Sequence, residues 1–189
     1  VNNRYQGVPD EGYTALIARL LEGCEVRLLT DYLSDRAGFD ALAVKTVYTG
    51  PLDGFFGYCY GPLLWRSLRF ETEVLDTDNY QGNAVVNYTA AEVPFTRIIE
   101  HKHFTFGTGE GTVISREYPD EWQPGKEPYY PLNNEETEAL CARYRALAKA
   151  ERRVIFGGRL GEYKYYDMDQ IVRRALTAAA DELGKGTES

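Results

Sequence analysis

The segment 156–172, FGGRLGEYKYYDMDQIV, contains the transition that decides the fold. It continues the short apolar run 154–156, breaks at Gly157 and Gly158, and ends in a segment whose apolar residues recur at helical spacing. A strand, a glycine-containing turn and a helix in succession are typical of an α/β layer. We therefore predict a strand at 154–156 and a last helix that begins close to Met168.

The first 50 residues also predict helical and extended elements. Apolar residues at helical spacing favour a helix over 13–22, which Gly23 ends. The runs CEVRLL (24–29) and ALAVKTVY (41–48) are predicted to be strands. The chain therefore opens and closes with pieces of an α/β layer.

Four runs of β-branched and aromatic residues, separated by turn residues, occupy the middle of the chain. They are LRFETEVL (68–75), NAVVNYT (83–89), PFTRIIEHKHF (94–104) and GTVISREY (111–118). Such a succession predicts an antiparallel sheet. The glycine-rich stretch before them, GPLDGFFGYCYG, is consistent with a short helix or with an ordered loop. After the sheet, Asn134 is the predicted N-cap of a helix over 134–150.

These elements together predict an α/β (α+β) fold with two domains. The pieces at 1–50 and 151–189 would form one discontinuous α/β domain. The segment 51–150, mainly antiparallel sheet with a helix at 134–150, would be inserted into it as a second domain.

Composition limits the classes of function. The 189 residues carry a formal net charge of −8, which disfavours general nucleic-acid binding because neutralising phosphates needs a basic face. No apolar run is long enough to span a bilayer, and the 3 widely spaced cysteines have no metal or redox spacing. We predict a cytoplasmic protein without membrane insertion. The chain begins at Val1 rather than Met, so we expect a fragment or a processed chain.

Two arginines are candidate anion-binding residues. Arg159 follows Gly157 and Gly158 in a pattern that differs from the dinucleotide fingerprint. Spacing alone favours an ordinary turn there, although a guanidinium suits phosphate well. Arg97 is a candidate anion clamp on a predicted strand.

Histidines crowd the same predicted strand as Arg97. Strand alternation would place one set of side chains on a single face: Arg97, Ile99, His101 and His103. Two histidines at this spacing would suit zinc, but no further ligand is grouped with them. We therefore favour a sheet face and predict no metal site.

Six segments occur in one order over nearly the whole chain: YQGVPDEGYT, VYTGPLDGFFGYCYGPLLWRSL, DNYQGNAVVNYTAAEVPFTRIIEHKHF, REYP, PYYPL and FGGRLGEYKYYDMDQIV. Taken together, they resemble the bacterial UDP-galactopyranose mutases. That family's N-terminal Rossmann segment, with its glycine fingerprint, cannot be located in this sequence. The resemblance therefore implies the C-terminal part of such an enzyme, which we expect to be inactive in isolation.

The resemblance implies a flavin-dependent isomerase that interconverts UDP-galactopyranose and UDP-galactofuranose for galactofuranose-containing cell-surface glycans. Its implied cofactor is reduced FAD, whose N5 atom attacks the anomeric carbon, displaces UDP and holds the sugar as an adduct during ring opening and reclosure. Residues 1–50 and 151–189 would belong to an FAD-binding domain and the sheet to a substrate domain. A homodimer is the implied assembly.

Matching motifs imply roles for individual residues. Substrate contacts are implied for Asn87, Arg97, Tyr130 and Tyr165, of which the last three would contact the diphosphate. Cofactor contacts are implied for Tyr32, Arg159, Asp167 and Met168. Catalytic roles are implied for Arg97, Arg159 and Asp167, with Arg159 stabilising the reduced flavin. Glu117 resembles a further carboxylate of the active-site region.

Two other functions stay open at this point. A related two-domain FAD oxidoreductase of the amine-oxidase type fits the fold but not the pairing of PFTRIIEHKHF with EYKYYDMD. Consumption of an electron acceptor would favour it. A non-catalytic module that binds a nucleotide sugar is the third possibility. Normal turnover of the restored full-length enzyme in both Arg97→Ala and Arg159→Ala would contradict the site assignment.

Overall fold

The structure is a computed structural model that describes residues 4, 5 and 7–185. Its internal contacts divide the chain into two compact units. The sheet unit comprises residues 1–30 and 68–120, and the helical unit comprises residues 31–67 and 121–189. The predicted division into 1–50 with 151–189 and an inserted 51–150 stays a prediction.

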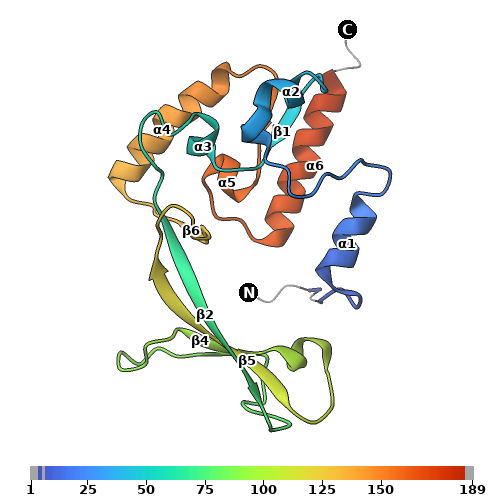
Figure 1. Ribbon diagram of the computed structural model, residues 1–189, viewed down its shortest axis with the longest axis vertical. Helices are drawn as coiled ribbons and strands as arrows, with labels where there is room; N and C mark the ends of the chain where they lie inside the picture. Colours follow the sequence, from blue (N-terminus) through green and yellow to red (C-terminus); the bar gives the residue numbers. More distant parts are fainter. Residues whose placement is uncertain (1–3, 6, 186–189) are drawn as a thin grey trace. The chain divides into compact units, whose positions relative to one another are not determined.

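The sheet unit contains most of the antiparallel strands (Figure 1). Its elements are α1 (Gly12–Leu20), the larger part of β2 (Trp65–Leu75), β3 (Val85–Asn87), β4 (Arg97–Glu100), the 3₁₀ helix η2 (His101–Thr105) and nearly all of β5 (Thr112–Glu121). The strand order is β3-β4-β5-β2-β6, and β3 with β4, β4 with β5, and β2 with β6 pair antiparallel. The predicted antiparallel sheet is therefore confirmed.

The run 24–29 is not a strand, so that prediction is wrong. Leu29 has a positive φ of 52°, and Leu28 and Leu29 are almost fully exposed. An isolated extended segment gains little, because a strand is stabilised by hydrogen bonds and side-chain pairs with a neighbour. The predicted strand at 41–48 is also too long, since only β1 (Thr46–Tyr48) is extended.

The helical unit combines a parallel strand pair with most of the helices (Figure 1). Its further elements are the 3₁₀ helix η1 (Tyr32–Asp35), α2 (Arg36–Asp40), α3 (Leu52–Phe55), β6 (Tyr130–Pro131), α4 (Glu135–Ala150), β7 (Val154–Phe156), α5 (Gly158–Glu162) and α6 (Met168–Lys185). Strand β1 pairs parallel with β7, with Tyr48 opposite Phe156. With the antiparallel sheet, this pair gives the mixed α/β class that the sequence predicts.

Local sequence explains the helix that follows β6. Asn134 is its N-cap, and the Asn134 side chain accepts a hydrogen bond of 2.8 Å from the backbone N–H of Thr137. Three acidic residues in the first turn stabilise the helix further, because their negative charges lie at the positive end of the helix dipole. On the inner face, Tyr144 is fully buried, whereas Leu140 and Leu147 are partly buried against the same core.

The core of the helical unit joins α3, α4 and the start of β2 around aromatic rings. Its buried members are Leu52, Leu63, Trp65, Cys141, Tyr144 and Tyr163. Phe56, which follows α3, and Leu160 and Phe156, from α5 and β7, pack against them. This packing fixes the position of α5, a short helix that stands where the spacing of the glycines predicts an ordinary turn.

Gly161 lets α5 approach the end of β1 closely. A Cβ added there would lie 2.9 Å from the backbone oxygen of Tyr48 and 3.5 Å from that of Gly50. A backbone oxygen cannot rotate away as a flexible side chain can. The segment after β7 is therefore held against β1 by the absence of a side chain.

We expect Gly161→Ala to lower the free energy of unfolding by about 1–3 kcal/mol, the usual cost of overpacking. Urea denaturation measures the change. Gly157→Ala is the matched control, because a Cβ there meets nothing within 4 Å and its φ is −147°. Equal stability of the two variants would contradict the proposed close approach.

In the sheet unit, a buried carboxylate organises the loop that precedes β3. Glu100 is 0% exposed and accepts hydrogen bonds from the backbone N–H groups of Tyr80 (3.0 Å) and Gln81 (2.9 Å). The hydroxyl of Thr112 donates at 2.8 Å, and His103 Nε2 lies 3.0 Å away. Burial opposes ionisation, but these partners outweigh it and lower the pKa of Glu100 to about 2.

We expect Glu100→Gln to destabilise the protein at pH 7 by about 2 kcal/mol, since its charge-assisted hydrogen bonds are lost. Because the pKa lies below its ordinary 4.5, the stabilisation is complete above pH 4.5 and disappears as the pH falls through about 2. Urea unfolding at several pH values between 7 and 2 should therefore show that the parent and the variant differ less in free energy of unfolding as the pH falls. Glu73→Gln removes a half-exposed partner of Arg116 and should have little effect. A gap that does not change with pH would refute this account.

Candidate functional site

Three of the predicted site residues form one row across the sheet unit. Asn87 at the end of β3 pairs with Arg97 on β4, and Arg97 pairs with Glu117 on β5. Directly opposed residues of neighbouring strands project to the same face of a sheet. Strand register therefore places an amide, a guanidinium and a carboxylate side by side, although they are separated widely in the sequence.

The carboxylate of this row positions the arginine. Glu117 is 6% exposed, and its Oε1 accepts a hydrogen bond of 2.8 Å from the hydroxyl of Thr96. Arg97 Nε lies 3.2 Å from the same oxygen, and 39% of the Arg97 side chain is exposed. The pair thus has a buried acidic end and an accessible basic end, which suits an anionic ligand on the open side.

The two histidines do not continue the alternation predicted for them. Strand β4 ends at Glu100, and residues 101–105 turn into the 3₁₀ helix η2. His101 Nε2 lies 2.8 Å from the hydroxyl of Ser115, whereas His103 faces Glu100. Within the described residues, no group of three metal-ligating side chains is found.

In the helical unit, Arg159 begins a stack of three side chains. Its guanidinium carbon lies 4.2 Å from the centre of the Tyr165 ring. The Tyr165 ring stacks on Tyr130 with 5.5 Å between centroids and 25° between planes. A hydrogen bond of 2.8 Å from Arg159 Nε to the backbone oxygen of Tyr166 holds the guanidinium in place. The stack joins α5, the segment after it, and β6.

Asp167 lies at the start of α6 and contacts this stack. Its Oδ1 accepts a hydrogen bond of 3.2 Å from the hydroxyl of Tyr165. The side chain of Gln170 accepts at 3.1 Å from the backbone N–H of Asp167, as in a capping box. Met168, the first residue of α6, is 62% exposed. The Asp167 carboxylate therefore orients the Tyr165 hydroxyl, and the Gln170 side chain caps the backbone N–H of Asp167.

Two neighbouring tyrosines are structural. Tyr163 has a positive φ of 48° and ends α5. Its buried hydroxyl donates to the backbone oxygen of Leu64 and accepts from the N–H of Leu132 at 3.1 Å. Tyr166 is 8% exposed and donates to the carboxylate of Glu162. Of the three tyrosines between 163 and 166, Tyr165 alone presents its ring to Arg159.

Tyr32 lies apart from this stack, in η1. Its hydroxyl donates to Asp40 at 2.7 Å, and its ring is 5.7 Å from that of Tyr48. Burial, together with the hydrogen bond to Asp40, raises the pKa of Tyr32. The Tyr32 side chain is thus engaged in packing. The cofactor contact that the resemblance implies for Tyr32 would therefore have to come from its backbone.

Arg66 is a candidate that the sequence reasoning missed. Strand pairing places it directly opposite Tyr130, and both residues line a cavity of about 600 Å³. Within the described residues, its guanidinium forms no ion pair. Alternation within WRSLRF shows that Arg66 faces away from buried Trp65 and Ser67, but only the register with β6 brings it beside Tyr130.

Comparison with known proteins decides what kind of protein carries these residues. The family model described as UDP-galactopyranose mutase matches residues 1–165, which include both the Asn87–Arg97–Glu117 row and the Arg159 stack. The chain belongs to the UDP-galactopyranose mutase family. The resemblance seen in the sequence motifs is thereby confirmed.

Several mutases are similar to this chain over most of its length. A probable UDP-galactopyranose mutase of Klebsiella pneumoniae is 39% identical over 185 residues, 96% of this chain and 47% of the relative. A dTDP-fucopyranose mutase of Escherichia coli is 33% identical over 94% of this chain and 48% of its own length. The UDP-galactopyranose mutase of Mycoplasma pneumoniae is also 33% identical, over 92% of this chain and 47% of its own length. The chain spans about half the length of the curated relatives it matches.

Proposed function

We propose that this mutase-family chain forms part of an isomerase that interconverts UDP-galactopyranose and UDP-galactofuranose. The observation that carries the proposal is the stack of Arg159, Tyr165 and Tyr130 within a match to the mutase family. A cation and two phenols within one stack suit a diphosphate-linked sugar, since guanidinium and hydroxyl groups bind phosphate oxygens.

Four residues are proposed to hold the substrate. Arg97 contacts the diphosphate with its accessible face while Glu117 fixes its other side. Asn87, adjacent in the same row, contacts the sugar nucleotide through its amide. Tyr130 and Tyr165 offer two stacked phenols to the diphosphate. Within its own unit, each of these groups is held by strand pairing or stacking, which lowers the entropic cost of ordering its side chain.

The residues around the glycine turn fit an FAD cofactor. A Cβ at Gly157 would meet nothing within 4 Å, so a flat ring system can approach the backbone there. Only the Nε of Arg159 is engaged by a hydrogen bond within the described part of the chain. Its terminal nitrogens can therefore face a ligand. Arg159, Asp167, Met168 and the backbone of Tyr32 are proposed to contact the cofactor.

When bound in its reduced form, FAD would supply the nucleophile for exchange at the anomeric carbon. Arg159 is proposed to stabilise negative charge on the reduced cofactor. Arg97 is proposed to stabilise the departing diphosphate. Asp167 accepts a hydrogen bond from the Tyr165 hydroxyl, and this bond is proposed to orient the Tyr165 phenol for the substrate.

We further propose that the β1–β7 pair with its helices belongs to a discontinuous FAD-binding domain, into which the antiparallel sheet is inserted. The chain would then act only together with a further N-terminal segment, and residues 1–189 alone would be inactive. A cytoplasmic homodimer engaged in making galactofuranose-containing glycans completes the proposal. Within the described residues, no helix is both long enough and apolar enough to cross a bilayer.

The deciding experiment uses the polypeptide that includes this N-terminal segment, loaded with FAD and reduced with dithionite. Chromatography should show UDP-galactopyranose formed from UDP-galactofuranose without consumption of an electron acceptor. Steady acceptor consumption would instead support an oxidoreductase of the amine-oxidase type. Absence of any conversion in the folded, FAD-loaded protein would leave only a module that binds nucleotide sugars.

One comparison names a second candidate substrate. The relative from Escherichia coli is named for dTDP-fucopyranose, which differs from UDP-galactopyranose in both its base and its sugar. The assay run in the opposite direction, with dTDP-fucopyranose and UDP-galactopyranose compared as substrates, separates the two possibilities. We expect kcat/KM to be higher for the UDP-galactose pair, and the reverse ranking would reassign the substrate.

A further inference from the structure

The hydroxyl of Tyr163 joins the two segments that hold the stacked tyrosines Tyr130 and Tyr165. Tyr163 follows α5 directly, and the chain reaches Tyr165 two positions later. The hydroxyl donates to the backbone oxygen of Leu64 and accepts a hydrogen bond of 3.1 Å from the backbone N–H of Leu132, two positions after Tyr130. One side chain thus links the segment after α5 to the β2–β6 pair.

The strand that holds Tyr130 has little pairing of its own. Strand β6 contains only 2 residues, and one of them, Pro131, has no backbone N–H to donate to β2. On either side of β6, the N–H groups of Tyr129 and Leu132 each donate at 3.0 Å to the chain of β2 or to the residue just before it. So short a pair holds its two strands together but leaves their place against α5 to side chains.

Packing fixes the Tyr163 side chain at this point of the helical unit. Tyr163 is 2% exposed, and its ring meets the Trp65 ring edge-on with 4.9 Å between centroids. The hydroxyl also lies 3.1 Å from the backbone oxygen of Leu132. Burial raises the pKa of Tyr163 above its ordinary value of 10. The phenol therefore keeps its proton at neutral pH and continues to donate.

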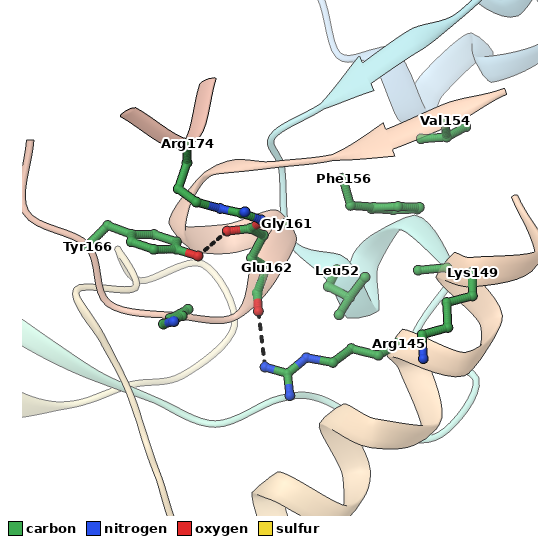
Figure 2. A pocket seen from close by; sticks show the side chains of 11 residues that line it. Leu52, Arg145, Lys149, Val154, Phe156, Gly161, Glu162, Tyr166 and Arg174 are labelled. Carbon is green, nitrogen blue, oxygen red and sulfur yellow. Dashed lines mark hydrogen bonds and ion pairs between the residues drawn. The ribbon is translucent and has the colours of Figure 1, made fainter. Parts of the chain in front are cut away.

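The short helix α5 is itself anchored through Glu162 (Figure 2). The backbone oxygen of Glu162 accepts a hydrogen bond of 3.3 Å from Arg145 of α4. Its carboxylate accepts from Tyr166 and from Arg174 of α6. These bonds tie α5 to two longer helices, so the Tyr163 hydroxyl holds the β2–β6 pair against a fixed support.

We propose that Tyr163 is a positioning residue, whose hydroxyl sets the separation of the Tyr130 and Tyr165 rings. Because Tyr163 is buried, it acts through these two phenols rather than by contact with a ligand. Its importance for turnover rests on the proposed function, since the phenols serve a diphosphate only when both reach its oxygens.

Tyr163→Phe removes the hydroxyl and keeps the ring, so the packing against Trp65 remains. In the complete FAD-loaded enzyme we expect UDP to bind about tenfold more weakly, the effect of weakening one hydrogen bond to a charged group. KM for UDP-galactofuranose should rise by a similar factor while kcat falls less than about threefold, because the weakened contact serves ground state and transition state alike. Calorimetry with UDP and steady-state assays measure these values.

Tyr144→Phe is the matched control. Tyr144 is also a buried core tyrosine, whose hydroxyl accepts from the backbone N–H of Tyr60 at 3.0 Å and donates to the backbone oxygen of Gly61 at 2.7 Å. Both partners precede β2, and neither belongs to β6. We expect both variants to lower the urea midpoint of unfolding, but only Tyr163→Phe to weaken UDP binding. Equal losses of UDP affinity in both variants, or none in Tyr163→Phe, would overturn the proposal.

A double-mutant cycle tests whether Tyr163 acts through Tyr130. Tyr130→Phe removes one phenol hydroxyl from the diphosphate. In that background, Tyr163→Phe should change UDP affinity less than about twofold, because the contact that it displaces is already gone. An undiminished loss in both backgrounds would show that the Tyr163 hydroxyl acts independently of Tyr130 and would contradict the positioning role.

Crystal structures give a readout that does not depend on activity. The Tyr130 and Tyr165 ring centroids lie 5.5 Å apart in the parent. This separation should change by more than about 0.5 Å in Tyr163→Phe, which exceeds the tolerance of a preorganised site, and by less in Tyr144→Phe. An unchanged separation in Tyr163→Phe would refute the positioning role even in an active enzyme. A parent enzyme that binds no UDP would instead refute the proposed function, and the ring separation would still decide the role of Tyr163.

Discussion

Replacing Arg97 by alanine is expected to lower kcat of the complete FAD-loaded enzyme by about 100- to 1,000-fold, the usual cost of losing one electrostatic contact in the transition state. Two effects add. The diphosphate loses a cation, and the carboxylate of Glu117, which is 6% exposed, loses the charge beside it and then repels the anionic substrate. Steady-state assays with dithionite-reduced enzyme measure the loss.

Arg116→Ala is the matched control for Arg97→Ala. Arg116 is also an arginine of the sheet unit and is paired with a carboxylate, Glu73, at 2.9 Å. It lies opposite Ile98 on the neighbouring strand, so its side chain projects to the other face from Arg97. We expect its loss to change kcat less than twofold. Normal turnover in Arg97→Ala, or equal losses in both variants, would refute the role given to Arg97.

Replacing Arg159 by alanine is the second large effect that we expect. The cation beside a reduced flavin stabilises its anionic form, so its removal should make the reduction potential more negative by about 30–60 mV, equivalent to about 1.4–2.8 kcal/mol for two electrons. We also expect kcat to fall about 100-fold. A spectroscopic redox titration measures the first quantity and the isomerase assay the second.

Two further variants define what Arg159 contributes. Arg159→Lys keeps the charge but loses the planar group that lies on Tyr165, so the potential should stay close to that of the parent while kcat falls. Arg173→Ala removes an exposed arginine of α6 that pairs with Asp169 at 3.9 Å and should change neither quantity. An unaltered potential in Arg159→Ala would show that this guanidinium does not act on the flavin.

Local patterns in the sequence were sufficient to predict many elements. Asn134 followed by acidic residues predicted the start of α4, because capping depends on neighbours along the chain. The apolar run 154–156 predicted β7, whereas the ordinary turn expected after it is the short helix α5. The four β-rich runs predicted strands, since alternating apolar and polar residues fit a sheet with one buried face.

Features that depend on distant partners could not be predicted. The run CEVRLL has strand-forming residues but no neighbouring strand, so it stays irregular. Alternation through His101 and His103 failed because β4 ends at Glu100, whose carboxylate binds the loop at Tyr80 and Gln81. Arg66 was missed because its position beside Tyr130 follows from strand register across a gap of more than 60 residues.

The row of Asn87, Arg97 and Glu117 also constrains how the gene can vary. Because successive strand residues face opposite ways, one inserted codon within β4 would turn Arg97 to the wrong side and bring Ile98 into its place. Codons added between β3 and β4, or in the loop before β5, would leave the pairing intact. Deletions and insertions that survive selection should therefore gather in these connections, and permuted termini or affinity tags are best placed there.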